Sequence, residues 1–124
     1  MEKPQFIEHR GIKYYVLDLC DRQTSERNSL IEECGRQVQS QPEKSVYVIT
    51  NVTGVKFDSD FINMLKYLAK NNEPHVIKSA VVGLGGLQRV AMMIISSFSN
   101  RTFHEFERVE KAVDFFVADS LSKN

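Results

Sequence analysis

Residues 46–69 limit the possible folds of this chain more than any other segment. Residues 46–52 (VYVITNV) are rich in β-branched and apolar side chains at odd and even positions alike. Such a run is typical of a strand that helices cover on both faces of a sheet. Gly54 then provides a turn, and apolar residues recur beyond it with the helical period, at Phe61, Met64, Leu65, Leu68 and Ala69. The segment predicts a strand–turn–helix unit.

The ends of this predicted helix are marked by local signals. Asp58 is a good N-cap residue, and Phe57 and Ile62 flank it at the spacing of a hydrophobic staple. Asn72 and Pro74 supply the stop signal at the other end. We therefore expect the helix to begin just after Asp58 and to end before Pro74.

The residues before this unit predict a hairpin and a first helix. Residues 6–9 and 12–19 are typical of two strands joined by Arg10-Gly11, and the first strand is expected at a sheet edge because it is short and follows Pro4. A surface helix is predicted over residues 26–39, with either Thr24 or Ser25 as its cap.

The residues after the central unit continue the alternation of strands and helices. We predict a strand over residues 76–84, a tight turn at Gly85-Gly86 and a helix over residues 87–98. A short strand over residues 102–106 and a helix over residues 107–121 follow. This alternation favours right-handed crossovers. The sequence thus predicts an α/β fold, a mixed and mostly parallel sheet of about five strands with four helices, in a single domain over residues 1–124.

Charge and composition exclude some classes of function. The 124 residues contain 16 basic and 16 acidic side chains, and this balance argues against a nucleic-acid-binding protein, which needs a surplus of positive charge. A net charge of zero also permits self-association. We expect no signal peptide and no transmembrane segment, because neither the start of the chain (MEKPQF) nor any later segment is a long apolar run. A cytoplasmic location is the resulting expectation.

No motif for catalysis, metal binding or cofactor binding is visible. Cys20 and Cys34 lack a C-x-x-C spacing and are expected to pack as small apolar residues. His9, His75 and His104 fall on different predicted elements, and Gly-x-Ser-x-Gly is absent. We therefore predict a protein without metal or cofactor and do not favour an enzyme.

The helix predicted over residues 87–98 is apolar almost all round. Such a helix is either buried on most sides or forms an interface. Three interpretations are open: packing in the core against a neighbouring helix, a homodimer interface, and a site for a lipid-like ligand between helix and sheet. The residues that we single out for an interface or an apolar ligand are Leu87, Val90, Met93, Ile94 and Phe98.

Two segments resemble the STAS superfamily, specifically its SpoIIAA-like group, which is also described as SEC14-like. Residues 46–61 (VYVITNVTGVKFDSDF) are similar to the anti-sigma-factor-antagonist pattern of a strand, a Ser-Gly-Val-like turn and Phe-x-Asp-Ser-Ser-Gly opening a helix. Residues 79–117 resemble the ending of that group: a small-residue strand, Gly-x-x-Gly-Leu, an apolar helix, a short strand ending in Phe and a last helix with paired aromatic residues. The resemblance implies a STAS-like fold.

The resemblance also implies a regulatory role without catalysis, through binding of a partner protein at the turn and helix start. The residues concerned are Thr53, Gly54, Asp58, Ser59 and Asp60. The SEC14-like description implies the alternative role, a carrier or sensor of an apolar, lipid-like ligand.

The sequence departs from the antagonist pattern at the position where antagonists are phosphorylated. Asp60 stands at the phosphoacceptor serine, and Phe61 replaces the following glycine. A carboxylate at a helix N-terminus is favoured by the helix dipole and could mimic a permanently phosphorylated state. The simpler interpretation is that Asp58, Ser59 and Asp60 only cap a helix.

Overall fold

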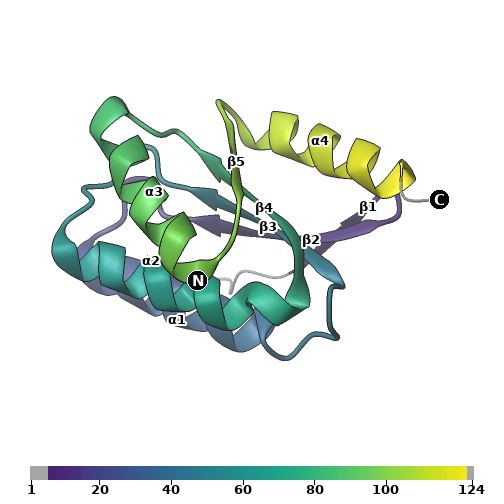
Figure 1. Ribbon diagram of the computed structural model, residues 1–124, viewed down its shortest axis with the longest axis horizontal. Helices are drawn as coiled ribbons and strands as arrows, with labels where there is room; N and C mark the ends of the chain where they lie inside the picture. The colour runs from purple at the N-terminus through teal and green to yellow at the C-terminus, as the bar shows by residue number, and fades with distance from the viewer. Residues whose placement is uncertain (1–5, 123–124) are drawn as a thin grey trace.

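A five-stranded sheet whose spatial order follows the sequence forms the centre of the protein (Figure 1). The computed structural model describes residues 6–122. Its strands are β1 (Ile7–His9), β2 (Ile12–Asp18), β3 (Val46–Asn51), β4 (Val76–Val82) and β5 (Phe103–Phe106). β1 is antiparallel to β2, and every other neighbouring pair is parallel. The predicted mixed, mostly parallel sheet with an antiparallel first edge is confirmed.

Four helices cover the two faces of the sheet unequally. They are α1 (Thr24–Val38), α2 (Ser59–Asn72), α3 (Gly86–Ser99) and α4 (Val109–Leu121), and a 3₁₀ turn, η1 (Glu73–His75), follows α2. Figure 1 shows α1, α2 and α3 on one face and α4 on the other. α2 lies in the middle of the three-helix layer, because it contacts both α1 and α3. The predicted α/β fold with four helices is therefore confirmed.

The sheet separates two apolar cores, and β3 contributes to both. Val46 and Val48 face the layer of α1, α2 and α3, whereas Tyr47 and Ile49 face α4. The ring of Tyr47 stacks on Phe116 of α4, with the ring centroids 4.5 Å apart. The central strand is thus covered on both faces, as its unbroken apolar run predicts.

The predicted boundaries hold to within about two residues, but the predicted cap of the first helix is wrong. Neither Thr24 nor Ser25 caps α1: both lie inside it, and the N-cap is Gln23, whose extended backbone carries no side-chain capping bond. The carbonyl of Gln23 accepts the first helical bond from the Arg27 N–H at 2.8 Å. The helix therefore begins at Thr24, two residues before the predicted start.

The turn between β4 and α3 also differs from the prediction. Gly85 has an extended backbone as the N-cap of α3, and Gly86 is the first residue of the helix. The left-handed conformation falls instead on Gly83, at φ +85°. Gly83 allows the chain to leave β4 where it passes close to the β3–α2 turn, so the glycine that this connection requires is not one of the predicted pair.

Candidate functional site

The five residues predicted to bind a partner lie together in the loop and helix start that follow β3. We call this surface, formed by Thr53, Gly54, Asp58, Ser59 and Asp60, the β3–α2 turn. All five residues are exposed. They follow the carboxyl end of a parallel strand, the edge at which α/β folds carry their sites. Strand order does not reverse among the five described strands, so their carboxyl ends do not form the switch-point crevice at which many α/β folds bind nucleotides.

Short hydrogen bonds hold the first part of the β3–α2 turn. The Val55 N–H donates to the Val52 carbonyl at 3.0 Å, and Gly54 between them has φ +75°. The side-chain oxygen of Asn51 accepts from the backbone N–H of Thr53 at 3.1 Å and from its hydroxyl at 2.7 Å. These bonds close the turn on itself and leave Thr53 and Gly54 presented to solvent.

Gln88, which belongs to no recognisable motif, ties the turn to α3. Its side-chain oxygen accepts from the Gly85 N–H at 2.6 Å, and its side-chain nitrogen donates to the carbonyl of Val55. One side chain thus caps the start of α3 and fixes its distance from the β3–α2 turn. The two residues are 33 positions apart in the sequence, so a local sequence pattern does not predict this contact.

Asp58 and Asp60 have different surroundings within the same turn of helix. Asp58 is the N-cap of α2, as predicted, and its carboxylate accepts from the Phe61 N–H at 2.9 Å. Asp60 is exposed in the first turn, and within residues 6–122 no ion-pairing side chain reaches it. The capping interpretation therefore accounts for Asp58 and leaves the carboxylate of Asp60 available to other molecules.

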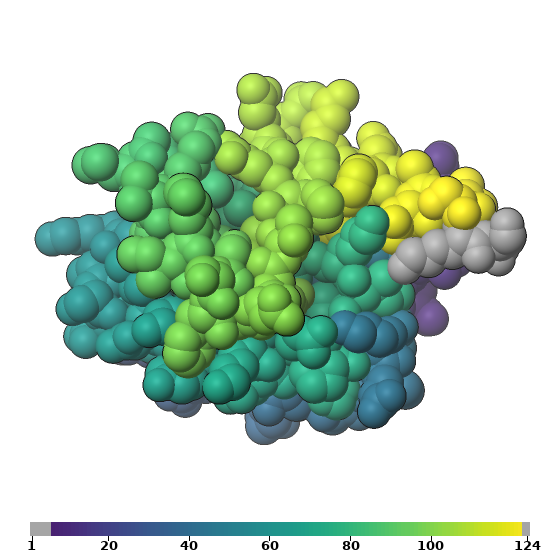
Figure 2. Space-filling view, in the orientation of Figure 1, coloured from purple at the N-terminus to yellow at the C-terminus, as the bar shows by residue number. Residues whose placement is uncertain are grey.

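The second predicted surface is the outer face of α3, which we call the α3 face: Leu87, Val90, Met93, Ile94 and Phe98. The first four are exposed to 90%, 59%, 71% and 51%, respectively. The same helix buries Ala91, Met92 and Ile95 against the core. Core packing is therefore correct for the inner side of α3 and wrong for the α3 face, because α2 covers only one flank of this helix. Figure 2 shows α3 at the molecular surface beside α2.

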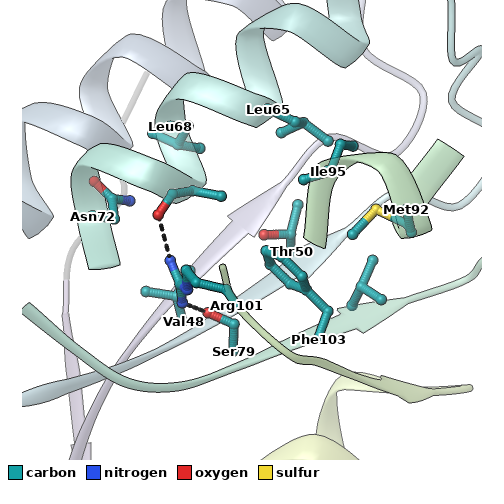
Figure 3. A pocket seen from close by; sticks show the side chains of 12 residues that line it. Val48, Thr50, Leu65, Leu68, Asn72, Ser79, Met92, Ile95, Arg101 and Phe103 are labelled. Atoms are coloured by element: carbon teal, nitrogen blue, oxygen red, sulfur yellow. Dashed lines mark hydrogen bonds between the residues drawn. The ribbon is translucent and has the colours of Figure 1, made fainter. Parts of the chain in front are cut away.

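The space between α3 and the sheet is nearly filled. A cavity of about 30 Å³ lies there, lined among others by Thr50, Leu65, Met92 and Phe103 (Figure 3). Its volume corresponds to roughly one water molecule. An acyl chain does not fit into this space while α3 is packed as observed.

A partly buried arginine borders this cavity. Arg101 donates to the carbonyl of Ala69 at 3.0 Å and to the hydroxyl of Ser79 (Figure 3), and its guanidinium lies 5.3 Å from the centroid of the Phe103 ring. Burial lowers the pKa of Arg101 to about 10. Because the Ala69 carbonyl lies near the C-terminus of α2, the cation meets the negative end of the helix dipole. Arg101 therefore holds the α3–β5 loop against α2.

The residues with potential for acid–base or metal chemistry are dispersed. His9 is in β1, His75 in η1 and His104 in β5. Partial burial and the nearby Lys78 ammonium lower the pKa of His104. Within residues 6–122, no group of three or more His, Cys, Asp or Glu side chains is placed to hold a metal ion.

The two cysteines have different environments. Cys34 is fully buried, as expected of a small apolar residue, whereas Cys20 is only partly covered. Both are free thiols. The expectation of apolar packing is therefore confirmed for Cys34 and does not describe Cys20.

Comparison with protein-family models yields no match, and comparison with curated proteins yields none either. No helix within residues 6–122 combines the length and hydropathy needed to cross a bilayer.

Proposed function

We propose that this protein is a non-enzymatic, cytoplasmic regulatory module of the STAS type that binds a partner protein through the β3–α2 turn. The observation that carries the proposal is the combination of exposure and rigidity in this turn. Its five residues face solvent, while Asn51, Gln88 and the Asp58 cap hold the backbone beneath them. A rigid loop loses little conformational entropy when it binds.

The charge of Asp60 supports docking rather than a phosphorylation switch. In the STAS-type pattern, this position carries the serine that becomes phosphorylated, and here it carries an exposed carboxylate. The N-terminus of α2 stabilises a negative charge in its first turn. We propose that Asp60 presents a constant negative charge to a cationic group of the partner, so that affinity does not depend on a kinase.

Charge reversal at Asp60 tests this proposal. Tagged wild-type protein, Asp60→Ala and Asp60→Arg would be used to capture partners from cells of the source organism, with identification by mass spectrometry. Asp114→Arg is the matched control, because Asp114 is an exposed acid on α4. We expect a partner that both Asp60 variants lose and that the control retains. Unchanged capture by both Asp60 variants, with native circular dichroism, would exclude this surface.

The alternative function, a carrier of an apolar ligand, places different demands on the structure. A cavity of about 30 Å³ would have to open by movement of α3 away from α2 and the sheet. Native mass spectrometry of the purified protein separates the two functions. A discrete added mass with the properties of a lipid would favour the carrier, and protein that is repeatedly free of added mass would favour the interaction module.

A further inference from the structure

The α3 face has the pattern of a helix-packing seam without a partner helix. Leu87, Val90, Ile94 and Phe98 follow one another at spacings of three, four and four residues, the pattern of the contact positions in paired helices. Among residues 6–122, five of the eight exposed large apolar side chains belong to the α3 face. Concentration of such residues on one helix marks an interaction site, whereas scattered ones need no explanation.

The middle of this seam carries no net charge. The sequence of α3 contains no acidic residue, and its one basic residue, Arg89, is neutralised by Glu105 of β5. The Arg89 Nε lies 2.9 Å and 3.0 Å from the two carboxylate oxygens of Glu105. A partner therefore meets an apolar strip without an unpaired charge, which a similar strip matches best.

The two ends of the seam differ in shape and charge. At the Phe98 end, the ammonium groups of Lys66 and Lys70 lie 4.4 Å and 5.2 Å from the ring centroid of Phe98. A shallow groove of about 470 Å³ lies at this end, lined by Lys66, Met93, Ile94, Ser97 and Phe98. This end of the seam is thus basic and hollow.

The opposite end protrudes and is tied to a loop whose charged residues are net acidic. Leu87 is 90% exposed. The bond from Gln88 to Val55 ties this end to the loop that leads into α2, in which one cation, Lys56, precedes the two acids Asp58 and Asp60. The seam therefore has a projecting apolar side chain and carboxylates at one end, and a groove and ammonium groups at the other.

We infer that the α3 face binds a second copy of this chain, with the two α3 helices antiparallel about a two-fold axis. Such a contact is self-complementary, because each residue pair occurs twice. Leu87 of each copy enters the groove of the other, and Lys66 and Lys70 approach the acidic end of the second copy. A parallel arrangement would instead place lysines against lysines. The balanced overall charge of the chain adds no repulsion between copies.

Met93 lies at the axis in this arrangement. It is the exposed residue nearest to the midpoint between Leu87 and Phe98 in the sequence of α3, since Met92 is buried. Each Met93 therefore contacts its equivalent in the second copy, and the unbranched methionine side chain adapts to such a self-contact. This position gives the arrangement a specific geometric test.

The dimer shares only the acids Asp58 and Asp60 with the proposed docking function, and its apolar contact lies on the α3 face, so the two proposals can fail separately. Multi-angle light scattering of the purified protein measures the dimer alone. We expect a mass of two chains for the wild type and of one chain for Met93→Glu and Ile94→Glu. Leu121→Glu is the control, because Leu121 is 67% exposed on α4, away from the seam, and this variant should remain dimeric. A monomeric wild type at tens of micromolar, or a dimeric Ile94→Glu with a native fold, would overturn the inference.

Engineered cysteines test the direction of the helices. In a Cys20→Ser background, where the remaining Cys34 is fully buried, Met93→Cys should form a disulfide-linked dimer under mild oxidation. Leu87→Cys and Ser97→Cys should cross-link when mixed and not when each is oxidised alone. Cross-linking of Leu87→Cys with itself, without any of Met93→Cys, would show a different arrangement and refute the antiparallel seam.

Vesicles distinguish a second copy from a lipid surface. The acids Asp58 and Asp60 offset the attraction of Lys66 and Lys70 for an anionic membrane, so we expect no co-sedimentation with vesicles of phosphatidylcholine and phosphatidylserine. Vesicle binding that Ile94→Glu abolishes, by a wild type that is monomeric in solution, would assign the α3 face to membranes and overturn the dimer.

Discussion

Gly83 and Thr53 are packed so closely that position 83 has no room for a side chain. A Cβ atom added to Gly83 would overlap the hydroxyl oxygen of Thr53 and would lie 2.9 Å from its Cα. Gly83 also has φ +85°, a conformation that other residues adopt with strain. The contact joins the turn after β4 to the β3–α2 turn, so it bears directly on the proposed docking surface.

Gly83→Ala should therefore destabilise the protein substantially. The left-handed backbone alone costs a residue with a side chain about 1–2 kcal/mol, and the overlap with Thr53 adds to this. Urea denaturation followed by circular dichroism measures the difference. Gly86→Ala is the control, since a Cβ there meets open space, and it should leave the stability unchanged or raise it slightly. Equal stability of the two variants would show that the turn adjusts.

Removing a hydroxyl group should have opposite effects at Tyr15 and Tyr47. The Tyr15 hydroxyl is buried and makes no hydrogen bond within residues 6–122, whereas the Tyr47 hydroxyl donates to Asp119 at 3.0 Å. Tyr15→Phe removes an unsatisfied polar group and should raise stability or leave it unchanged. Tyr47→Phe removes a bond and should lower stability by about 1 kcal/mol. Thermal denaturation of both variants checks the sign, and a clear loss of stability in Tyr15→Phe would reveal a partner for that hydroxyl.

Loss of the Asp58 cap should weaken α2. The carboxylate satisfies the Phe61 N–H, and removal of such a cap typically costs about 1 kcal/mol. We expect Asp58→Ala to lose this stability in chemical denaturation, Asp58→Asn to retain most of it, and Asp60→Asn to change little. Asp60→Asn distinguishes an effect on stability from an effect on docking, because the Asp60 carboxylate takes no part in the capping bond, which is made by Asp58. A loss in Asp60→Asn as large as in Asp58→Ala would contradict the distinction drawn between the two acids.

Alkaline pH should destabilise the protein through Cys34 first. Burial raises the pKa of this thiol from 9.0 to about 12, so above pH 9 the unfolded chain loses a proton that the folded chain keeps. Stability that is complete below pH 9 therefore declines as the pH rises through this interval. Burial also raises the pKa values of Tyr15 and Tyr47 from 10.0, and their contribution is lost only at higher pH.

A comparison of slopes isolates the contribution of Cys34. The unfolding free energy of wild type and Cys34→Ala would be measured between pH 8 and about pH 9.5, mostly below the interval in which the tyrosines and Arg101, whose pKa is about 10, contribute. The wild type should lose stability across this range and the variant should lose less, whatever its absolute stability. If the unfolding free energies of the two proteins changed equally with pH, the pKa of the Cys34 thiol would not be raised by burial.

The order of elements follows from the sequence because periodicity and turn residues are local signals. The unbroken apolar run of β3 and the helical repeat that ends at Ala69 depend only on neighbouring residues. The cap of α1 was missed because Thr24 and Ser25 are both favourable caps adjacent to Gln23. Such a choice is decided by packing of the helix on the sheet rather than by propensity.

The contacts that shape the two candidate surfaces are not local. Gln88 reaches Val55 across 33 positions, and Arg101 reaches Ala69 across 32. The composition of α3 indicates an apolar helix, yet which side remains exposed depends on strand order. Because β5 forms the sheet edge, α3 is the last helix of its layer, and among residues 6–122 it has a neighbouring helix on one flank only. The sequence predicts the residues of the α3 face, but that they are exposed follows only from the order of the strands in the fold.

The agreement between strand order and sequence order has a consequence for how the chain folds during synthesis. Each strand after β1 pairs with the strand made just before it, so each new strand–helix unit can add to a finished edge as it leaves the ribosome. α4 is an exception, since within the part of the chain that the structure describes it is the one helix on the second face of the sheet. Until α4 has been synthesised, Tyr47, Ile49 and Ala80 on that face are exposed to solvent. Nascent chains are therefore most prone to chaperone binding and aggregation in the interval before α4 leaves the ribosome.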